Sequence, residues 1–207
     1  MNKKEHIPVI IANGSFPTHP LPLSLIDAAD YIVCCDGAAN NAIAHNIIPD
    51  AIVGDCDSIS EENKKKFQHI LHKNPDQETN DLTKAVRFCM EKGVKQVKIV
   101  GATGKRDDHT IGNISLLVEY LNHIDVEMIT DYGIFKPIHQ TSVFNSFAGQ
   151  QISIFCIDRQ PLTSEGLRYP INNQILENWW QGTLNECISN RFKIITNGRC
   201  IIFSAFE

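Results

Sequence analysis

Short apolar runs rich in β-branched residues alternate with helix-like patterns through about the first 130 residues. Such alternation is typical of βαβ units, in which helices connect the strands of a mainly parallel sheet. The first part of the chain is therefore predicted to be an α/β domain. The runs that predict its strands are Ile7–Ala12, Tyr31–Cys35, Ala51–Val53, Val97–Val100 and Val126–Thr130.

Helices are predicted where apolar residues recur every three or four positions. Such stripes cover residues 82–90 and 111–121, and Gly93 is suited to end the first of these helices. Ser58 and Glu61 have the spacing of a capping box, which predicts a third helix with a basic face.

The pattern changes after about residue 132 to brief strands separated by turn residues. Asn197 and Gly198 predict a hairpin between the last two strands. We therefore expect two domains, residues 1–132 and residues 133–207, the second smaller and antiparallel. Its predicted strands are Thr141–Phe147, Gln151–Ile157, Arg191–Thr196 and Cys200–Phe206.

Composition and charge narrow the class of protein. A chain of 207 residues with 43% hydrophobic residues can bury a substantial core, and its net charge of −5 argues against a nucleic-acid partner. No run of 18 apolar residues occurs, so no membrane span is predicted. The basic start and short apolar run are interrupted by Asn13 and Gly14, which predicts no secretory signal. Together with scattered cysteines that form no C-x-x-C pair, this indicates a cytoplasmic protein.

Polar residues gather where the predicted parallel strands end, and these ends share one rim of a sheet where ligands bind. Asp55 and Asp57 directly follow a buried strand, and in an extended chain residues two apart point to the same side. Paired carboxylates of this kind fit Mg²⁺ bound together with phosphate oxygens. A simple turn explains the same residues about equally well. The polar residues at the rim are Asn13, Asp36, Asp55, Asp57, Arg106 and Asp108.

Two further segments have both a functional and a structural interpretation. In the polar loop from Asp76 to Lys84, Asp81 fits either a metal site or the first turn of a helix, and Lys84 either a phosphate or an ion pair with Asp81. The loop from Gly101 to His109 suits phosphate oxygens, although it matches neither the Walker pattern nor G-x-G-x-x-G. His109 fits a capping or packing role better than that of a general base.

Taken together and in this order, the segments resemble the thiamin pyrophosphokinase family over nearly the whole chain. Ala38, Asn80, Lys105 and Leu184 stand where the family usually has Gly, Thr, Gly and Ser. The matching residues are Ala12-Asn13-Gly14, Asp36-Gly37-Ala38-Ala39-Asn40, Pro49-Asp50, Gly54-Asp55-Cys56-Asp57-Ser58, Asp76-Gln77, Asp81, Lys84, the loop from Gly101 to His109, Asn113, Gly166-Leu167-Arg168-Tyr169-Pro170 and Asn185-Glu186.

The resemblance implies a Rossmann-like α/β domain followed by an antiparallel β-sandwich, in a homodimer with active sites shared between subunits. It implies transfer of the pyrophosphoryl group of ATP to thiamine with Mg²⁺, giving thiamine diphosphate and AMP. The catalytic residues expected on this basis are Asp55, Asp57, Asp81, Arg106 and Asp108. The expected ATP-binding residues are Asn13, Asp36, Gln77, Lys84 and Arg106, the thiamine-binding residues Asp108, Tyr169 and Asn185, and the magnesium ligands Asp55, Asp57 and Asp81.

Two other classes of function stay open on the residues alone. Paired aspartates at strand ends also serve a magnesium-dependent phosphohydrolase or nucleotidyltransferase, which would consume ATP without thiamine. A nucleotide- or metal-binding module without turnover would more naturally have lost one of Asp55, Asp57 and Asp81, and all three are present.

Overall fold

The computed structural model describes residues 7–206, which form two compact units. The first, the α/β unit, extends to residue 131 apart from residues 117–122, which belong with residues 132 onward to the second, the β unit. The basic start of the chain, on which the expected absence of a secretory signal partly depends, lies outside the described residues.

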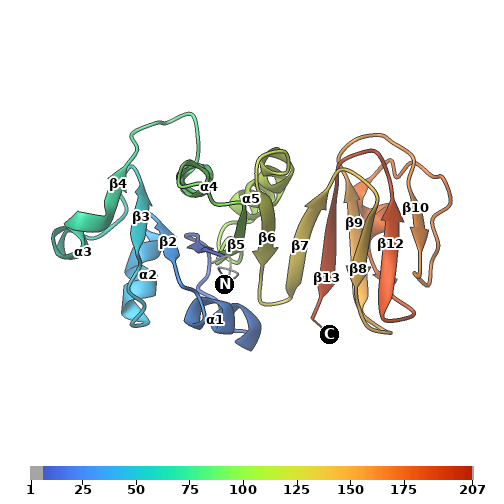
Figure 1. The fold of residues 1–207 in the computed structure, drawn as a ribbon, viewed down its shortest axis with the longest axis horizontal. Helices are drawn as coiled ribbons and strands as arrows, with labels where there is room; N and C mark the ends of the chain where they lie inside the picture. Colours follow the sequence, from blue (N-terminus) through green and yellow to red (C-terminus); the bar gives the residue numbers. More distant parts are fainter. Residues whose placement is uncertain (1–6, 207) are drawn as a thin grey trace, which may run out of the picture. The chain divides into compact units, whose positions relative to one another are not determined.

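The α/β unit is built on a parallel sheet with the strand order β6-β5-β1-β2-β3-β4 (Figure 1). Every residue of β1, β2 and β3 is buried, as expected for parallel strands covered on both faces. The five predicted strands are confirmed to within two residues at either end, whereas the exposed β4 was not predicted. The strands are β1 (Val9–Ile11), β2 (Ile32–Cys35), β3 (Ala51–Gly54), β4 (Leu71–Lys73), β5 (Gln96–Val100) and β6 (Asp125–Ile129).

Helices cover both faces of this sheet: α4 and α5 lie on one side, and α1 and α2 on the other (Figure 1). A short helix, η1 (Gln68–Ile70), follows α3. None of the helices in residues 7–206 has the length and hydropathy needed to cross a membrane. The helices are α1 (Pro20–Asp27), α2 (Ala38–Ala44), α3 (Glu61–Lys66), α4 (Asp81–Glu91) and α5 (Asp107–Tyr120).

The helix ends confirm one predicted signal and correct another. Gly93 follows α4 with φ +80°, the left-handed conformation that ends a helix at low cost for glycine. The predicted cap of α3 is wrong, because Ser60 and not Ser58 accepts a hydrogen bond from the backbone of Asn63. Ser58 instead donates to the side chain of Asp57 at 2.8 Å. The local spacing did not distinguish two serines that lie two positions apart.

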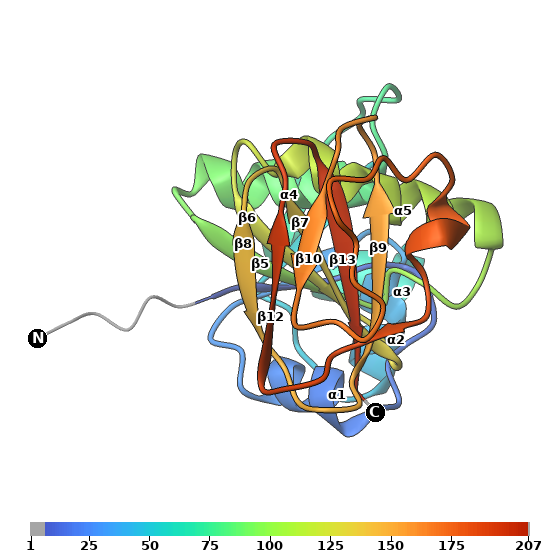
Figure 2. The ribbon, with the colours of Figure 1, turned by 90° about the vertical axis from the view of Figure 1, so that its right-hand side faces the viewer.

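The β unit contains two antiparallel sheets, ordered β11-β9-β13-β7 and β10-β12-β8, with a shared apolar core (Figures 1 and 2). Figure 2 views this unit from the side on which β10 and β12 lie in Figure 1. A short helix, η2 (Trp179–Gly182), packs against β9. The strands are β7 (Gly133–Ile138), β8 (Ser142–Asn145), β9 (Gln151–Cys156), β10 (Thr163–Glu165), β11 (Asn185–Glu186), β12 (Arg191–Ile195) and β13 (Cys200–Ala205).

The predicted hairpin between the last two strands is wrong. Strand β12 pairs with β8 and β10, whereas β13 pairs with β7 and β9. Neither Asn197 nor Gly198 has the positive φ that a type I′ hairpin turn requires. Both strands contribute to the same core, Phe192 and Ile194 from β12 and Ile202 from β13. The two strands therefore lie in different sheets and bury these side chains between the sheets. They do not pair edge to edge.

Candidate active site

The loops that follow β1 and β5 are joined by short backbone hydrogen bonds. Gly14 N donates to Gly101 O at 2.6 Å, and Ser15 N donates to Thr103 O at 2.8 Å. The two strands are neighbours in the parallel sheet, so their carboxyl ends bring these loops together. The glycine loop predicted to suit phosphate oxygens is thus held against the segment after β1.

Side-chain amides tie this pair of loops to the start of α4. Lys105 Nζ donates to Asn13 Oδ1 at 3.3 Å and to the Asn13 carbonyl at 3.2 Å. Asn113 Nδ2 donates to Ala102 O at 2.8 Å, and Asn80 Nδ2 donates to Asn113 Oδ1 at 3.4 Å. Three loops that are far apart in sequence therefore share one hydrogen-bonded framework.

Replacing Gly14 by alanine is expected to destabilise the protein. A Cβ at Gly14 would lie 2.4 Å from Thr103 O and 2.5 Å from Gly101 O, and both are backbone atoms that cannot turn away. We expect a loss of about 1–3 kcal/mol in the free energy of unfolding, measured by urea denaturation. Gly112→Ala is the matched control, because nothing lies within 4 Å of a Cβ there and α5 would gain helix propensity. Equal stability of the two variants would contradict the close approach of the two loops.

Three aspartates meet beside these loops, at the ends of β2 and β3. Asp36, Asp55 and Asp57 each place a carboxylate oxygen within 4.8 Å of the other two. Asp36 is only 1% exposed, while the other two are accessible to solvent. Asp36 Oδ2 accepts a hydrogen bond from Ser58 N at 2.9 Å. We call these three residues the acidic cluster.

The reason given above for the approach of Asp55 and Asp57 requires correction. They do not lie on an extended chain, because Cys56 between them has a left-handed φ of +65°. Asp57 N donates to Asp55 Oδ1 at 3.3 Å, which is the hydrogen bond of an aspartate turn. The turn and the carboxylate pair, treated as alternatives, are therefore the same structure.

Gly54 allows a fourth aspartate to approach the acidic cluster. A Cβ at Gly54 would lie 2.7 Å from Asp36 Cβ and 3.1 Å from Asp81 Oδ1. Asp81 is the first residue of α4, whose N-cap Asn80 accepts from the backbone of Thr83. Asp81 Oδ1 also accepts from Lys84 Nζ at 3.2 Å, and the Lys84 side chain is 3% exposed. Of the two roles open to Lys84, the ion pair with Asp81 is therefore present, with Lys84 buried and the Asp81 side chain 36% exposed.

The surroundings shift the pKa of two cluster carboxyls in opposite directions. Burial raises the pKa of Asp36, and the negative charges of its aspartate neighbours raise it further. The hydrogen bond from Ser58 N lowers this pKa, but by less, so the net pKa is raised. Partial desolvation also acts to raise the pKa of Asp55. The hydrogen bonds from Asp57 and Gln77 and the charge of Lys84 outweigh that desolvation, so the net pKa of Asp55 is lowered.

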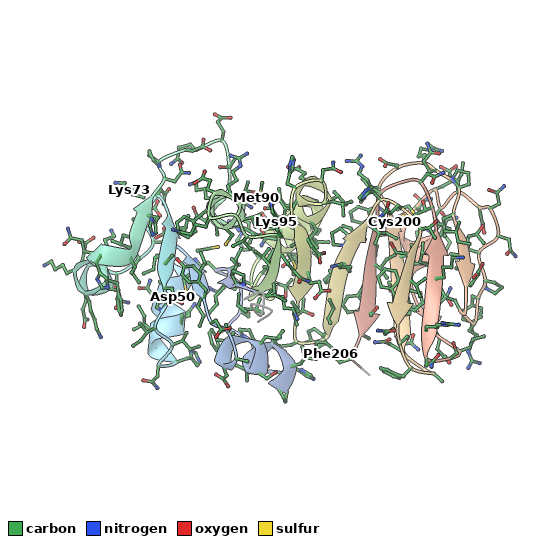
Figure 3. All side chains as sticks on the ribbon, viewed as in Figure 1. Asp50, Lys73, Met90, Lys95, Cys200 and Phe206 are labelled. Carbon is green, nitrogen blue, oxygen red and sulfur yellow. The ribbon has the colours of Figure 1, made fainter. Side chains whose placement is uncertain are left out.

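Gln77 and Arg106 approach from the remaining loops. Gln77 Nε2 donates to Asp55 Oδ2 at 3.4 Å, from the loop that follows Lys73 in Figure 3. Arg106 immediately precedes α5 and makes two hydrogen bonds to Asp108, from Nε at 3.0 Å and from Nη2 at 2.5 Å. This pairing lowers the pKa of Asp108 to about 2. Asp108 is therefore ionised across the neutral range.

These elements surround a cavity of about 490 Å³ within the α/β unit. The structure brings together six of the sequence-predicted residues along its wall, and among the described residues Asp36, Asp57 and Asp108 are not part of that wall. The predicted residues that line the cavity are Asn13, Asp55, Gln77, Asp81, Lys84 and Arg106. A cavity with both cations and carboxylates in its wall can bind a phosphate chain together with a metal ion.

Sequence reasoning assigned no role to Thr110 and named Thr103 only as part of the Gly101–His109 loop, and both residues line the cavity. Thr110 lies four residues after Arg106 and three before Asn113, so these positions share one face of α5. That spacing is visible in the sequence and could have identified Thr110. For Thr103 the sequence indicated the loop but not the individual residue, because its position depends on the contact between two loops.

The two predicted thiamine residues of the β unit are in contact with each other. Tyr169 N donates to Asn185 Oδ1 at 3.1 Å, and Asn185 Nδ2 donates to Tyr169 O at 2.7 Å. Tyr169 is 64% exposed, whereas Asn185 is 5% exposed. The amide of Asn185 therefore holds the backbone of Tyr169 and leaves the aromatic ring accessible.

Two family models match the chain. The model described as thiamin pyrophosphokinase, catalytic domain, matches residues 23–129, and the model described as thiamin pyrophosphokinase, substrate-binding domain, matches residues 133–203.

Individual proteins with the same description are similar to the chain. Thiamine pyrophosphokinase 1 of Oryza sativa subsp. japonica is 29% identical over 196 residues, which cover 80% of this chain and 74% of the rice protein. Thiamine pyrophosphokinase of Bacillus subtilis (strain 168) is 32% identical over 145 residues, 61% of this chain and 64% of that protein.

Solved structures share the fold. The crystal structure of thiamine pyrophosphokinase from Bacillus subtilis superposes with a TM-score of 0.80 at 24% identity, covering 96% of this chain and 98% of that one. Thiamin pyrophosphokinase from Candida albicans gives a TM-score of 0.80 at 17% identity, covering 100% of this chain and 95% of that one. The two-domain architecture expected from the sequence is thereby confirmed.

Proposed function

The chain belongs to the thiamin pyrophosphokinase family, and on this premise we propose which of its residues bind ATP, Mg²⁺ and thiamine. It is a transferase: it moves the pyrophosphoryl group of ATP to thiamine, giving thiamine diphosphate and AMP. The observation that carries the residue assignment is the 490 Å³ cavity, whose wall contains Asp55 of the acidic cluster together with residues of the Gly101–His109 loop. We propose that ATP binds in this cavity.

The residues present fit Mg²⁺. Carboxylate oxygens are the ligands that this hard cation prefers, and oxygens of Asp55 and Asp57 lie within 4.8 Å of each other in the acidic cluster, which Asp81 approaches across Gly54. We propose Asp55, Asp57 and Asp81 as magnesium ligands and catalytic residues. When bound, the cation would neutralise charge on the phosphate oxygens and lower the cost of developing negative charge.

The cationic and amide side chains of the cavity wall are proposed to bind the phosphate chain. Lys84 is fixed by α4 and desolvated, so its charge acts strongly on an anion nearby. Arg106 can offer a forked set of donors to phosphate oxygens from the start of α5. Gln77 and Asn13 present amide groups to the same cavity. Together these four residues would orient the phosphate chain for attack.

Asp108 is proposed to contact the acceptor side of the site. A carboxylate whose pKa is about 2 is a poor proton acceptor near neutral pH, which favours a role in orienting the thiamine hydroxyl over a role as general base. In this role Asp108 would accept a hydrogen bond from the hydroxyl while it stays ionised.

Tyr169 and Asn185 are proposed to bind thiamine, whose thiazolium ring is a cation. An exposed tyrosine ring suits a cation–π contact with such a ring. The hydrogen bonds of Asn185 to the backbone of Tyr169 would hold that ring in position. Because these residues lie in the β unit, we propose that residues 133–207 form the thiamine-binding and dimerisation domain. Residues 1–132 would then form the catalytic domain that binds ATP and Mg²⁺.

We further propose a homodimer in which each active site uses residues of both subunits. A cytoplasmic location is also proposed, because all seven cysteines are free thiols, as a reducing compartment maintains them.

The products of the reaction test the assigned function. With ATP, thiamine and Mg²⁺, we expect AMP and thiamine diphosphate in equal amounts, identified by phosphorus NMR and chromatography. A reaction without thiamine is the control and should leave ATP intact. Formation of ADP with thiamine monophosphate would refute pyrophosphoryl transfer, and thiamine-independent loss of ATP would indicate a phosphohydrolase.

A further inference from the structure

Asp36 has a buried carboxylate oxygen that receives no hydrogen bond. The residue follows β2 and is 1% exposed, and its Oδ2 accepts from Ser58 N at 2.9 Å. Its Oδ1 has no hydrogen-bond partner among the described residues. Leaving a buried oxygen of a charged group unpaired is costly, so such an oxygen in a native fold calls for a partner. A bound cation is one partner that a carboxylate oxygen can take.

The environment of Asp36 points to a cation. A carboxylate oxygen of Asp55 and one of Asp57 lie within 4.8 Å of a carboxylate oxygen of Asp36, and three negative charges this close repel one another. The two lysines that act on these acids are already engaged, Lys64 with Glu61 at 2.8 Å and Lys84 with Asp81 at 3.2 Å. Both lysines act on the cluster from a distance, and among the described residues neither of them supplies a hydrogen bond to Asp36 Oδ1.

We propose that Asp36 is itself a ligand of the divalent cation, through Oδ1, at a site completed by Asp55 and Asp57. This inference rests on the proposed function, and it gives Asp36 a role in ATP binding that acts through the cation. The proposal also predicts how much individual aspartates contribute to cation binding. Asp81 Oδ1 is paired with Lys84, so Asp81 contributes less than Asp36 to cation binding when no nucleotide is present.

The test measures Mn²⁺ binding to the nucleotide-free protein by the EPR signal of free Mn²⁺. Asp36→Asn keeps an oxygen for Ser58 N and turns an amide N–H₂ toward the cation position. We expect this variant to bind Mn²⁺ about tenfold more weakly or worse, and Asp81→Asn to bind it more tightly than Asp36→Asn does. Mn²⁺ should also raise the unfolding temperature of the wild type and not that of Asp36→Asn.

Asp50→Asn is the matched control. Asp50 also accepts one backbone hydrogen bond, from Ile32 N at 2.7 Å, but it is not part of the acidic cluster. It should bind Mn²⁺ as the wild type does, which separates loss of a ligand from loss of a structural carboxylate. Asp36→Ser, which also removes the carboxylate and adds no bulk, replaces Asp36→Asn if that protein does not fold.

Mn²⁺ affinity of Asp36→Asn equal to that of the wild type would overturn the role of Asp36. The assigned reaction would be untouched, because product analysis tests it separately. Absence of Mn²⁺ binding by the wild-type protein at millimolar concentration would overturn the cation site in the acidic cluster as a whole.

Discussion

Asp55→Asn and Asp57→Asn are each expected to lower kcat/KM by about 10²–10³, the usual cost of removing one well-placed electrostatic group from an active site. Asparagine keeps the size of aspartate and removes the charge that would hold the cation. In each variant the change also relieves repulsion within the acidic cluster, so the unfolding temperature should stay close to that of the wild type. Steady-state kinetics with saturating Mg²⁺, together with thermal melting, measure both effects.

Asp27→Asn is the control for this pair of variants, because Asp27 ends α1 and lies outside the acidic cluster and the cavity wall. It should retain full activity. Near-normal turnover of Asp55→Asn or Asp57→Asn at saturating Mg²⁺ would show that the Asp55–Ser58 segment is a structural turn without a catalytic role. A fall in activity that tracks a lower unfolding temperature would point in the same direction.

Mixed dimers of two inactive variants are expected to recover activity. One variant is Asp55→Asn, and the other carries Tyr169→Ala with Asn185→Ala, which disables the proposed thiamine segment. If each site takes its acidic cluster from one subunit and Tyr169 from the other, a mixed dimer contains one site built wholly from intact residues. Random pairing makes about half of the dimers mixed, so about a quarter of the wild-type activity should return.

The hydrogen bonds of Asn185 make a stability control necessary. Asn185→Ala removes both bonds to the backbone of Tyr169, so the unfolding temperature of the double variant must be measured. The single variant Tyr169→Ala leaves these backbone bonds in place and should show the same complementation. Confirmed mixed dimers that stay inactive would contradict the shared site and leave the assigned reaction standing.

The sequence was sufficient to predict the elements whose causes are local. Buried β-branched runs such as residues 51–53 predict strands of a parallel sheet, because both faces of those strands are covered by helices. The stripe through residues 82–90 predicts α4, and Gly93 predicts its end. The strand-end rule also identified Asn13, Asp55 and Arg106 of the cavity wall, because the parallel order of strands brings their carboxyl ends to one rim.

Other features depended on contacts between distant segments. Alternating residues in β12 and β13 fit a hairpin as well as two facing sheets, and only the shared core of Phe192 and Ile202 decides between them. Strand β7 was not predicted, and Pro137 within it argues against a strand when the sequence alone is considered.

The same distinction holds within the site. That Asp36, Asp55 and Asp57 are acidic and follow strands could be read from the sequence. The left-handed turn at Cys56 and the burial of Asp36 could not, since both depend on how two neighbouring strands and α4 pack around Gly54. Local patterns determine which residues stand at the rim of the sheet. Tertiary packing alone decides which of their atoms are desolvated and left facing one another, because burial is a property of the whole fold.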